Sequence, residues 1–432
     1  MWKYASKLHS RRLAGPLVRH YRVLAIESSC DDSCVALLDK YLAHDPPKII
    51  GQSKSTLNSA KEGGIIPTAA HEFHQMALAD LVQGFCAEHN LNSNSPPDLI
   101  CCTRGPGMVG SLSAGIQTAK GLSIAWNRPL IGVHHMLGHV LTAILPKTSQ
   151  PDLAPPRYPY LSLLCSGGHT MLVLLKSITD HKILINTSDI AAGDSIDKCA
   201  RVLGIEGNMR GKELETYVAN IPEELKAKFS KINTSSADNE FKLQMRLPLK
   251  GPSHLKVPDV VEFVFSQFQS TLQRFKEVNF PDQNIDEVTK QFVAYKIQET
   301  IFDHLIDRIN ISFFKHGLSK NGDGELAGVR DFICSGGVAA NQTLRKKLSE
   351  NLTYDANLQL SPDDMVFHFP DIALCTDNAV MIGTAGIEIL ENLKVKSDLK
   401  FLPIRRWPMN ELLDVDGWVV VSDAEFHEIR KF

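Results

Sequence analysis

YLSLLCSGGHTMLVLLK, at Tyr160–Lys176, and DFICSGGVAANQTLRKKL, at Asp331–Leu348, both place the tetrapeptide Cys-Ser-Gly-Gly directly after a run of apolar residues. In the first stretch a second apolar run follows the polar turn, which predicts a strand, a turn and a strand. In the second stretch a segment with helical spacing follows, which predicts a strand, a glycine turn and a helix. The repeated tetrapeptide suggests two similar half-domains that face one cleft.

The same two units occur earlier in the chain. Arg22–Lys40 reads RVLAIESSCDDSCVALLDK, with an apolar run on either side of a polar turn. Asp98–Leu122 gives an apolar run, the glycine-rich turn RGPGMVG and an alanine-containing periodic stretch. A hairpin followed by a strand, a glycine turn and a helix therefore occurs twice in the same order, which indicates an internal duplication.

The length of the chain agrees with two lobes of an α/β fold. A chain of 432 residues exceeds what one hydrophobic core usually supports. We expect lobes at 22–150 and 151–408, with the proline-rich stretch 145–159 as the linker between them. The second lobe would carry a helical insertion at about 205–315, and residues 409–432 would form a tail.

The composition is that of a globular protein, with 43% hydrophobic and 22% charged residues. The nine cysteines are odd in number and none forms a Cys-x-x-Cys pair. This pattern favours a reducing compartment and argues against a disulfide framework or a zinc ribbon. No apolar run reaches the roughly 18 residues that a membrane span needs.

The N-terminus has the composition of a mitochondrial transit peptide. Its first 22 residues contain six Lys or Arg and no Asp or Glu, and its apolar residues are scattered. We therefore expect a transit peptide at 1–21 and a location in the mitochondrial matrix; a basic tail is the alternative. The formal net charge of the whole chain is −3, so removal of the leader would leave a more acidic body. A nucleic-acid partner would then need a local basic patch.

Three turns with glycine or small residues are candidates for phosphate binding. They lie at Ser28–Asp32, Ser166–Thr170 and Ser335–Ala339. Such turns expose backbone N–H groups to phosphate oxygens, although most Ser-Gly-Gly sequences are ordinary tight turns. The P-loop pattern is absent, and the G-x-G-x-x-G of RGPGMVG lacks the acidic residue that a dinucleotide site requires.

A pair of histidines is the second chemical feature. His135 and His139 are four residues apart, so on a helix they share one face, whereas His134 points about 100° away. Such a pair is either structural or half of a metal site. Asp377 is either a helix N-cap or a third ligand. Two histidines and one carboxylate would form an open site for iron(II) or zinc, and the Glu that a zinc peptidase needs after the first histidine is absent.

Together these motifs resemble one family. IESSCDD, GPGMVGSLSAG, HHMLGH, CSGGHT, AAGDSIDK, SGGVAAN and CTDNAVMIG occur in the order found in the TsaD family of tRNA threonylcarbamoyl transferases. The resemblance covers roughly residues 22–408, ends in RRWP at Arg405–Pro408, and is nearest to the mitochondrial branch. It implies an actin-like ATPase fold, which is a duplicated ribonuclease H-like fold with two lobes around a central cleft.

The resemblance also implies an activity. Family members transfer a threonylcarbamoyl group from threonylcarbamoyl-AMP, made by a separate synthase, to N6 of the adenosine 3′ of the anticodon in tRNAs that read codons beginning with A. For this chain we expect mitochondrial tRNAs as substrates, one divalent metal ion (iron or zinc) per subunit, and a homodimer. A metallopeptidase and a non-catalytic actin-like nucleotide-binding protein are the alternatives.

Carried over residue by residue, the resemblance assigns the metal to His135, His139 and Asp377. It assigns contacts with the acyl-adenylate to a set of residues at the glycine turns and beyond them: Leu164, Cys165, Ser166, Gly167, Gly168, Asp197, Gly211 and Asn341. Asp31 and Asp32 are candidates for accepting a proton or supporting the metal, and equally for plain turn residues.

The chain departs from the family pattern in three places. Gly207–Lys212 reads GNMRGK where the family usually has Tyr-Pro-Gly-Gly-Pro, which weakens the assignment of Gly211. Phe265–Gln269 reads FSQFQ where Phe-Ser-Gly-Leu-Lys is usual, and His134 replaces an asparagine and is a potential competing ligand. Candidates for tRNA contact, with a solvated charged face as the alternative, are Arg201, Arg210, Lys212, Arg405 and Arg406.

Overall fold

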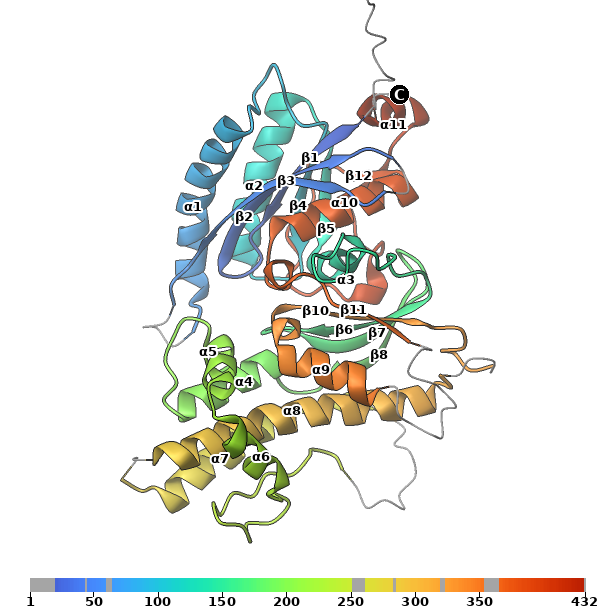
Figure 1. The fold of residues 1–432 in the computed structure, drawn as a ribbon. Helices are drawn as coiled ribbons and strands as arrows, with labels where there is room; N and C mark the ends of the chain where they lie inside the picture. Colours follow the sequence, from blue (N-terminus) through green and yellow to red (C-terminus); the bar gives the residue numbers. More distant parts are fainter. Residues whose placement is uncertain are drawn as a thin grey trace, which may run out of the picture.

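Two stacked β-sheets, with helices between them and on both outer faces, form the molecule (Figure 1). The structure is a computed structural model that describes residues 20–42, 45–59, 64–250, 261–282, 285–318, 323–352 and 365–430. The predicted transit peptide falls almost wholly outside these described residues. Among them, no helix combines the length and apolar character needed to cross a membrane.

The first sheet has seven strands in the order β13-β12-β5-β4-β1-β2-β3. Strands β1 and β2 form an antiparallel hairpin, β3 continues it antiparallel to β2, and β4 and β5 follow β1 as parallel neighbours. The strand bounds are Tyr21–Glu27 (β1), Asp32–Lys40 (β2), Lys48–Thr56 (β3), Leu99–Gly105 (β4), Leu130–His134 (β5), Val395–Ser397 (β12) and Trp418–Val420 (β13).

The second sheet has six strands in the order β11-β10-β6-β7-β8-β9. Strands β6, β7 and β8 form an antiparallel meander, and β10 and β11 follow β6 as parallel neighbours. The strand bounds are Tyr160–Cys165 (β6), Thr170–Leu175 (β7), His181–Thr187 (β8), Glu262–Phe263 (β9), Asp331–Ser335 (β10) and Val366–His368 (β11).

Both sheets thus contain one arrangement, a three-stranded meander whose first strand is followed by two parallel strands. This is the ribonuclease H-like unit, and its duplication confirms the predicted actin-like α/β fold. The twin Cys-Ser-Gly-Gly tetrapeptides, however, do not mark the two halves. Both lie in the second sheet, because β6 and β10 are parallel neighbours with Leu164 opposite Ser335. The prediction from the tetrapeptide is wrong, and the repeat of the longer units carries the duplication.

Helices form three layers around the sheets (Figure 1). Helices α1 and α2 cover the outer face of the first sheet, α3 and α10 lie between the sheets, and α4, α7 and α8 cover the outer face of the second. The helix bounds are Pro67–Glu88 (α1), Val109–Trp126 (α2), His135–Leu141 (α3), Ala192–Val202 (α4), Arg210–Ala219 (α5), Glu223–Lys231 (α6), Ser266–Asn279 (α7), Glu287–Lys315 (α8), Gln342–Asn351 (α9), Ala379–Leu393 (α10) and Asp423–Arg430 (α11). Short 3-10 helices are Thr142–Ile144 (η1), Gly337–Ala340 (η2), Ile372–Leu374 (η4) and Met409–Glu411 (η5).

The apolar runs in the central strands follow from this layering. In β1, Val23 and Ala25 face the core between the sheets, whereas Leu24 and Ile26 face α1 and α2. Successive side chains of a strand point to opposite faces, so a strand covered on both faces needs apolar residues at every position.

The C-terminal part of the chain returns to the first lobe. Strand β12 pairs with β5, β13 pairs with β12, and α10 packs against β1 and β2. Residues 379–408, which were expected in the second lobe, therefore contribute to the first sheet and its inner layer. The predicted tail at 409–432 supplies β13 and α11, and Phe426 and Ile429 of α11 are buried in the hydrophobic cluster to which α10 also contributes.

Candidate functional site

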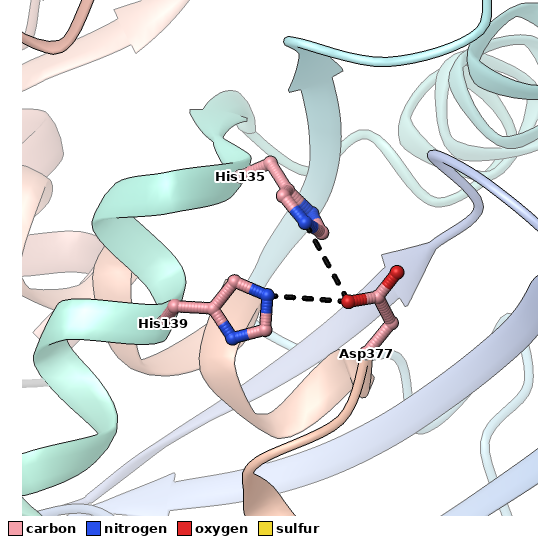
Figure 2. A group of neighbouring side chains, drawn as sticks. All are labelled: His135, His139 and Asp377. Carbon is pink, nitrogen blue, oxygen red and sulfur yellow. Dashed lines mark hydrogen bonds and ion pairs between the residues drawn. The ribbon is translucent and has the colours of Figure 1, made fainter. Parts of the chain in front are cut away.

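Three side chains converge between the lobes, and we call them the His-Asp cluster: His135, His139 and Asp377. The histidines lie one turn apart on α3, and Asp377 lies just before α10. The Nε2 atom of His139 is 3.2 Å, and that of His135 is 3.5 Å, from the same oxygen, Asp377 Oδ1 (Figure 2). One ligand atom from each residue lies within 4.8 Å of the others. The structure thus brings together the three residues grouped from the sequence.

His134 is committed to a structural role next to the cluster. It is the N-cap of α3, where its Nδ1 atom accepts hydrogen bonds from the N–H groups of Met136 (3.1 Å) and Leu137 (3.4 Å). Its Nε2 atom lies 2.9 Å from the carbonyl oxygen of Trp407. Burial lowers the pKa of His134 to about 3, so the ring is neutral. With both nitrogens engaged, His134 is not a competing ligand.

The helix cap that was the alternative role for Asp377 belongs to its neighbour. Asn378 is the N-cap of α10, and its Oδ1 atom accepts the N–H of Met381 at 2.9 Å. Its amide donates to the carbonyl groups of Leu374 (3.1 Å) and Thr376 (2.8 Å), which fixes the chain before the helix. The Asp377 carboxylate is therefore free to face the two histidines.

A buried carboxylate orients His135 from behind. Glu27, the last residue of β1, has Oε2 3.4 Å from His135 Nδ1, and the Ser29 hydroxyl is 3.1 Å from the same nitrogen. Glu27 also accepts the Ser29 N–H at 2.6 Å and the Thr103 hydroxyl proton. Burial disfavours the charged form of His135, but the carboxylates of Asp377 and Glu27 outweigh burial and raise its pKa to about 9.

These groups suit a divalent cation. Burial would raise the pKa of Asp377, yet His135 and His139 hold it well below its usual range, so the carboxylate is ionised. Two ionised carboxylates, Glu27 and Asp377, thus face His135 in a buried place and attract positive charge. Two imidazole nitrogens and a carboxylate oxygen form a donor set that iron(II) and zinc accept.

Asp31 ends the turn before β2 and Asp32 is the first residue of that strand, and the two differ in their surroundings. Asp32 accepts the ammonium of Lys54 and the hydroxyl of Thr56, each at 2.5 Å. Burial, and then the charges of Asp32 and Asp377, raise the pKa of Asp31 to about 6. Asp32 is therefore occupied as an ion-pair partner, whereas Asp31 can exchange a proton near neutral pH.

Hydrogen bonds within the first diglycine turn engage several of its own polar groups. The Ser166 hydroxyl accepts the N–H groups of Gly168 (3.3 Å) and His169 (3.1 Å), and the Ser166 N–H donates to the His169 carbonyl at 2.8 Å. The N–H of Gly193, in the first turn of α4, donates to the Ser166 carbonyl at 3.2 Å. Gly167 and Gly168 are exposed. The turn thus presents backbone to solvent next to a helix N-terminus.

Leu164 and Cys165 precede this turn as the last residues of β6. Both side chains are fully buried, so only their backbone groups could meet a ligand. Burial raises the pKa of the Cys165 thiol to about 12, and it raises the pKa of Cys334 on β10 as well. Both cysteines are therefore inert strand residues.

The second diglycine turn requires its glycine. Gly336 has φ of +98°, and a Cβ atom there would lie 2.6 Å from the Cys165 carbonyl oxygen. The chain continues through η2 to Asn341, which caps α9 by accepting two backbone N–H groups of its first turn. The Asn341 amide donates to Gln298 Oε1 at 3.1 Å. Asn341 is thus 7% exposed and held at this turn by its neighbours.

Asp197 and Gly211 form a third group. The Gly211 N–H donates to Asp197 Oδ1 at 2.6 Å, and burial raises the pKa of Asp197. Glu215 Oε1 accepts the N–H of Gln342 at 3.0 Å, which joins α5 to the residue after Asn341. Among the described residues no hydrogen bond joins this group to the His-Asp cluster.

Sequence reasoning missed three residues near the cluster. Glu27 carries a signal, because it is an acidic residue that ends an apolar strand. His169 follows the first diglycine; burial, and then the nearby His135 and His139, lower its pKa to about 4. Lys54 carries no signal, because a lysine in the polar strand β3 is ordinary, and only the fold brings it to Asp32.

Comparison with known proteins decides the family. The family described as "TsaD: tRNA N6-adenosine threonylcarbamoyltransferase" matches residues 48–384. The chain belongs to the TsaD family. The matched TsaD range contains the His-Asp cluster and both diglycine turns, whereas Glu27 and the C-terminal RRWP lie outside it.

Relatives in the TsaD family are similar over nearly their full lengths. The "tRNA N6-adenosine threonylcarbamoyltransferase, mitochondrial" of Schizosaccharomyces pombe is 36% identical over 413 residues, which are 94% of this chain and 91% of the relative. The tRNA N6-adenosine threonylcarbamoyltransferase of a Wolbachia species is 31% identical and covers 90% of this chain and 98% of the relative. That of Kosmotoga olearia is 32% identical and covers 85% and 93%.

Proposed function

We propose that this protein transfers a threonylcarbamoyl group from threonylcarbamoyl-AMP to N6 of the adenosine 3′ of the anticodon. Its substrates would be mitochondrial tRNAs that read codons beginning with A, and its location the mitochondrial matrix. Membership of the TsaD family supports the general reaction, and the mitochondrial S. pombe relative and the acid-free leader support the location. We also propose a homodimer that receives its donor from a separate synthase.

One observation carries the proposal, namely the His-Asp cluster between the lobes, beside the turn of the first hairpin. Ser29 of that turn contacts His135, and Lys54 of the neighbouring strand contacts the carbonyl of Asp377 at 3.2 Å. The donor is a mixed anhydride, so its carbonyl is already activated and no covalent nucleophile is needed. Because the carbonyl is already activated, the protein chiefly has to align the donor and the adenosine amine.

His135, His139 and Asp377 would hold one iron or zinc ion, which when bound polarises and orients an acyl oxygen. Glu27 fixes the ring of His135 through Nδ1 and so aims Nε2 at Asp377. The N–H of Gly167, for which the described residues show no acceptor, would receive the departing phosphate at the exposed diglycine turn. Leu164 and Cys165 would contribute backbone only, and Asp197, Gly211 and Asn341 would line the nucleoside end.

Asp31 is our candidate for accepting the proton that the adenosine amine loses. Its pKa of about 6 allows it to be ionised at the pH of the matrix and still accept a proton. Asp32 would act indirectly, because it is held by Lys54 and Thr56. The adenosine must leave its stack to reach this place.

A surface for the tRNA would lie next to the glycine-rich turn after β4. The Gly107 N–H donates to the Arg405 carbonyl (3.3 Å), and the Met108 N–H donates to the Ser29 carbonyl (2.9 Å). The hydroxyl of the same Ser29 contacts His135. The exposed guanidinium groups of Arg405 and Arg406 have no carboxylate partner among the described residues. We propose that they bind phosphates of the anticodon loop.

The direct test is formation of the modified nucleoside. Purified protein is incubated with mitochondrial tRNA, threonine, bicarbonate, ATP and an adenylate-forming synthase, and nucleosides are measured by mass spectrometry. We expect threonylcarbamoyladenosine with the wild type and a loss of both metal and product for His139→Ala. Cleavage of a protein substrate without modified adenosine would instead support the metallopeptidase alternative, although Met136 stands where a peptidase needs its glutamate.

A further inference from the structure

We propose that a cavity next to the His-Asp cluster binds the α-carboxylate of the donor's threonyl group, with Lys54 as its counter-ion. The inference rests on the proposed function and names a substrate contact that the cluster and the glycine turns do not provide. The threonyl carboxylate is the one permanent negative charge on the transferred group, so a site for that group needs a cation.

The cavity lies where β2 and β3 meet the segment before α10. Its volume is about 230 Å³. Lys54, Ser53 and Gln52 give it polar walls, Cys34 and Ala373 give it small apolar ones, and Asp377 of the cluster forms part of its lining. A water molecule occupies about 30 Å³ of liquid, so the cavity has room for a small amino-acid group. The cation, the polar walls and the small apolar surface of the cavity complement the carboxylate, the hydroxyl and the methyl of the threonyl group.

Lys54 has a donor to spare in this cavity. Its ammonium donates to Asp32 Oδ2 at 2.5 Å and to the carbonyl oxygen of Asp377 at 3.2 Å. An ammonium group has three N–H donors, so one remains. The contact with Asp32 is an ion pair in which Lys54 is the cationic partner. The side chain is 37% exposed, which leaves it accessible to a ligand.

The carbonyl contact with Asp377 places this cation beside a residue of the cluster. A threonyl group whose carboxylate reaches Lys54 would therefore have its carbamoyl end directed toward His135 and His139. Lys54 would then select the donor by charge and also align it. If Lys54 only stabilises the contact of β3 with Asp32 and Asp377, its loss should affect every donor equally. If Lys54 binds the carboxylate, its loss should affect the charged donor more than a neutral one.

The experiment compares two donors with two forms of the enzyme. One donor is threonylcarbamoyl-AMP, and the other carries a neutral carboxamide in place of the threonyl carboxylate. We expect the wild type to prefer the carboxylate donor by about 10- to 100-fold in kcat/KM, the range of a charge-assisted hydrogen bond. Lys54→Met should reduce that preference to less than about 3-fold, and Lys54→Arg should retain most of it. Lys48→Met, on the same strand but outside the cavity, is the matched control and should keep the wild-type preference.

Equal losses on both donors, with the wild-type ratio preserved in Lys54→Met, would overturn the inference and leave Lys54 as a structural tie. If Lys54→Met turns over neither donor, the same ratio is measured by equilibrium binding of the two donors without tRNA, with the same expected collapse. No transfer from either donor by the wild type would overturn the proposed function itself, which is a distinct result from a preserved ratio.

Discussion

Glu27 is the residue through which the first strand controls the His-Asp cluster. Its carboxylate faces Nδ1 of His135, so loss of its charge removes the group that fixes the ring. We expect Glu27→Gln to weaken the binding of iron or zinc about 10- to 100-fold, as is usual for the partners of metal-ligating histidines. Metal content after dialysis against graded chelator measures this, and circular dichroism checks the fold. Wild-type metal affinity in this variant would remove Glu27 from the site.

Asp31 makes stability depend on pH. Its pKa of about 6 in the folded chain exceeds the ordinary aspartate value of about 3.9, so the folded state binds the proton more tightly than the unfolded state. The stability that Asp31 contributes is therefore present below about pH 4 and is lost as pH rises through 6. In protein stripped of metal, Asp31→Asn should raise the free energy of unfolding at pH 8 by about 3 kcal/mol and change it by less than about 1 kcal/mol at pH 4.

Urea midpoints at the two pH values test this prediction. The exposed Asp282→Asn is the control and should show no difference between them. A gain of equal size at both pH values would mean that the asparagine stabilises the turn by packing and that Asp31 titrates normally. If Asp31 also accepts the substrate proton, kcat should rise with pH through about 6 in the wild type and lose that rise in Asp31→Asn.

Helices α3 and α10 position the two sides of the cluster relative to each other. They pack closely at Gly138, where a Cβ atom would lie 3.1 Å from Met381 Cγ and 3.2 Å from Ile382 Cδ1. Gly138→Val should push the helices apart, destabilise the protein by about 1–3 kcal/mol and weaken metal binding, because His139 and Asp377 lie on opposite sides of this contact. Gly121→Val, in α2 with nothing within 4 Å, is the matched control and should cost no stability. Full metal binding by Gly138→Val would show that the helix contact does not set the cluster.

The centre of each sheet was predictable from local pattern. An apolar run beside a polar or glycine turn predicts β1, β2 and β4 in the first sheet and β6, β7 and β10 in the second, whereas β3, β5 and β8 were not predicted. The four-residue spacing of His135 and His139 predicts one helix face. The cap at Asn378 was not predictable, because Asp377 and its neighbour are both good capping residues and only the fold decides which one caps. The role of Lys54 was not predictable either, because it also depends on the fold. Its contact with Asp377 joins residues that are 323 positions apart, and no periodicity records such a distance.

The lobe boundaries expected from the sequence were also affected by contacts between residues far apart in the chain. The helical stretch of α10 and the short strands β12 and β13 have ordinary sequences, and nothing local indicates which sheet they join. The decision depends on the apolar surface between the sheets, where α10 contributes Val380, Met381 and Ile382 to the shared core. The elements α10, β12 and β13 follow the second sheet in the sequence but pack on the first sheet. The order of elements along the chain does not indicate this placement.

Binding of tRNA should depend on local basic side chains, because the chain as a whole has a formal net charge of −3. With Arg405 and Arg406 next to the site, the double variant Arg405→Ala/Arg406→Ala should weaken tRNA binding and reduce the slope of log K against log salt by about 1 to 2, one phosphate contact for each arginine. Metal content should not change. Arg274→Ala, an exposed arginine on α7, is the control. An unchanged salt slope would place the tRNA on another surface.

The C-terminal segment holds the whole molecule together. The carbonyl of Met409 accepts from His181 of the second sheet at 3.0 Å, while Arg430 pairs with Glu391 of α10 at 2.8 Å. Five of its apolar side chains are buried in the hydrophobic cluster that α3 and α10 share: Met409, Leu412, Val421, Phe426 and Ile429.

Deletion of residues 409–432 should therefore prevent stable folding. Each buried side chain contributes about 1.5–3 kcal/mol, so their summed loss reaches the whole stability of a typical protein. The milder Phe426→Ala should cost about 3–5 kcal/mol and lower the melting temperature, with the fold and the metal site retained. Thermal melts of Phe426→Ala and soluble yield of the truncated chain measure the two effects, and exposed Phe314→Ala is the control. A truncated chain that remains soluble, binds metal and melts like the wild type would show that the first lobe is complete without its returning segment.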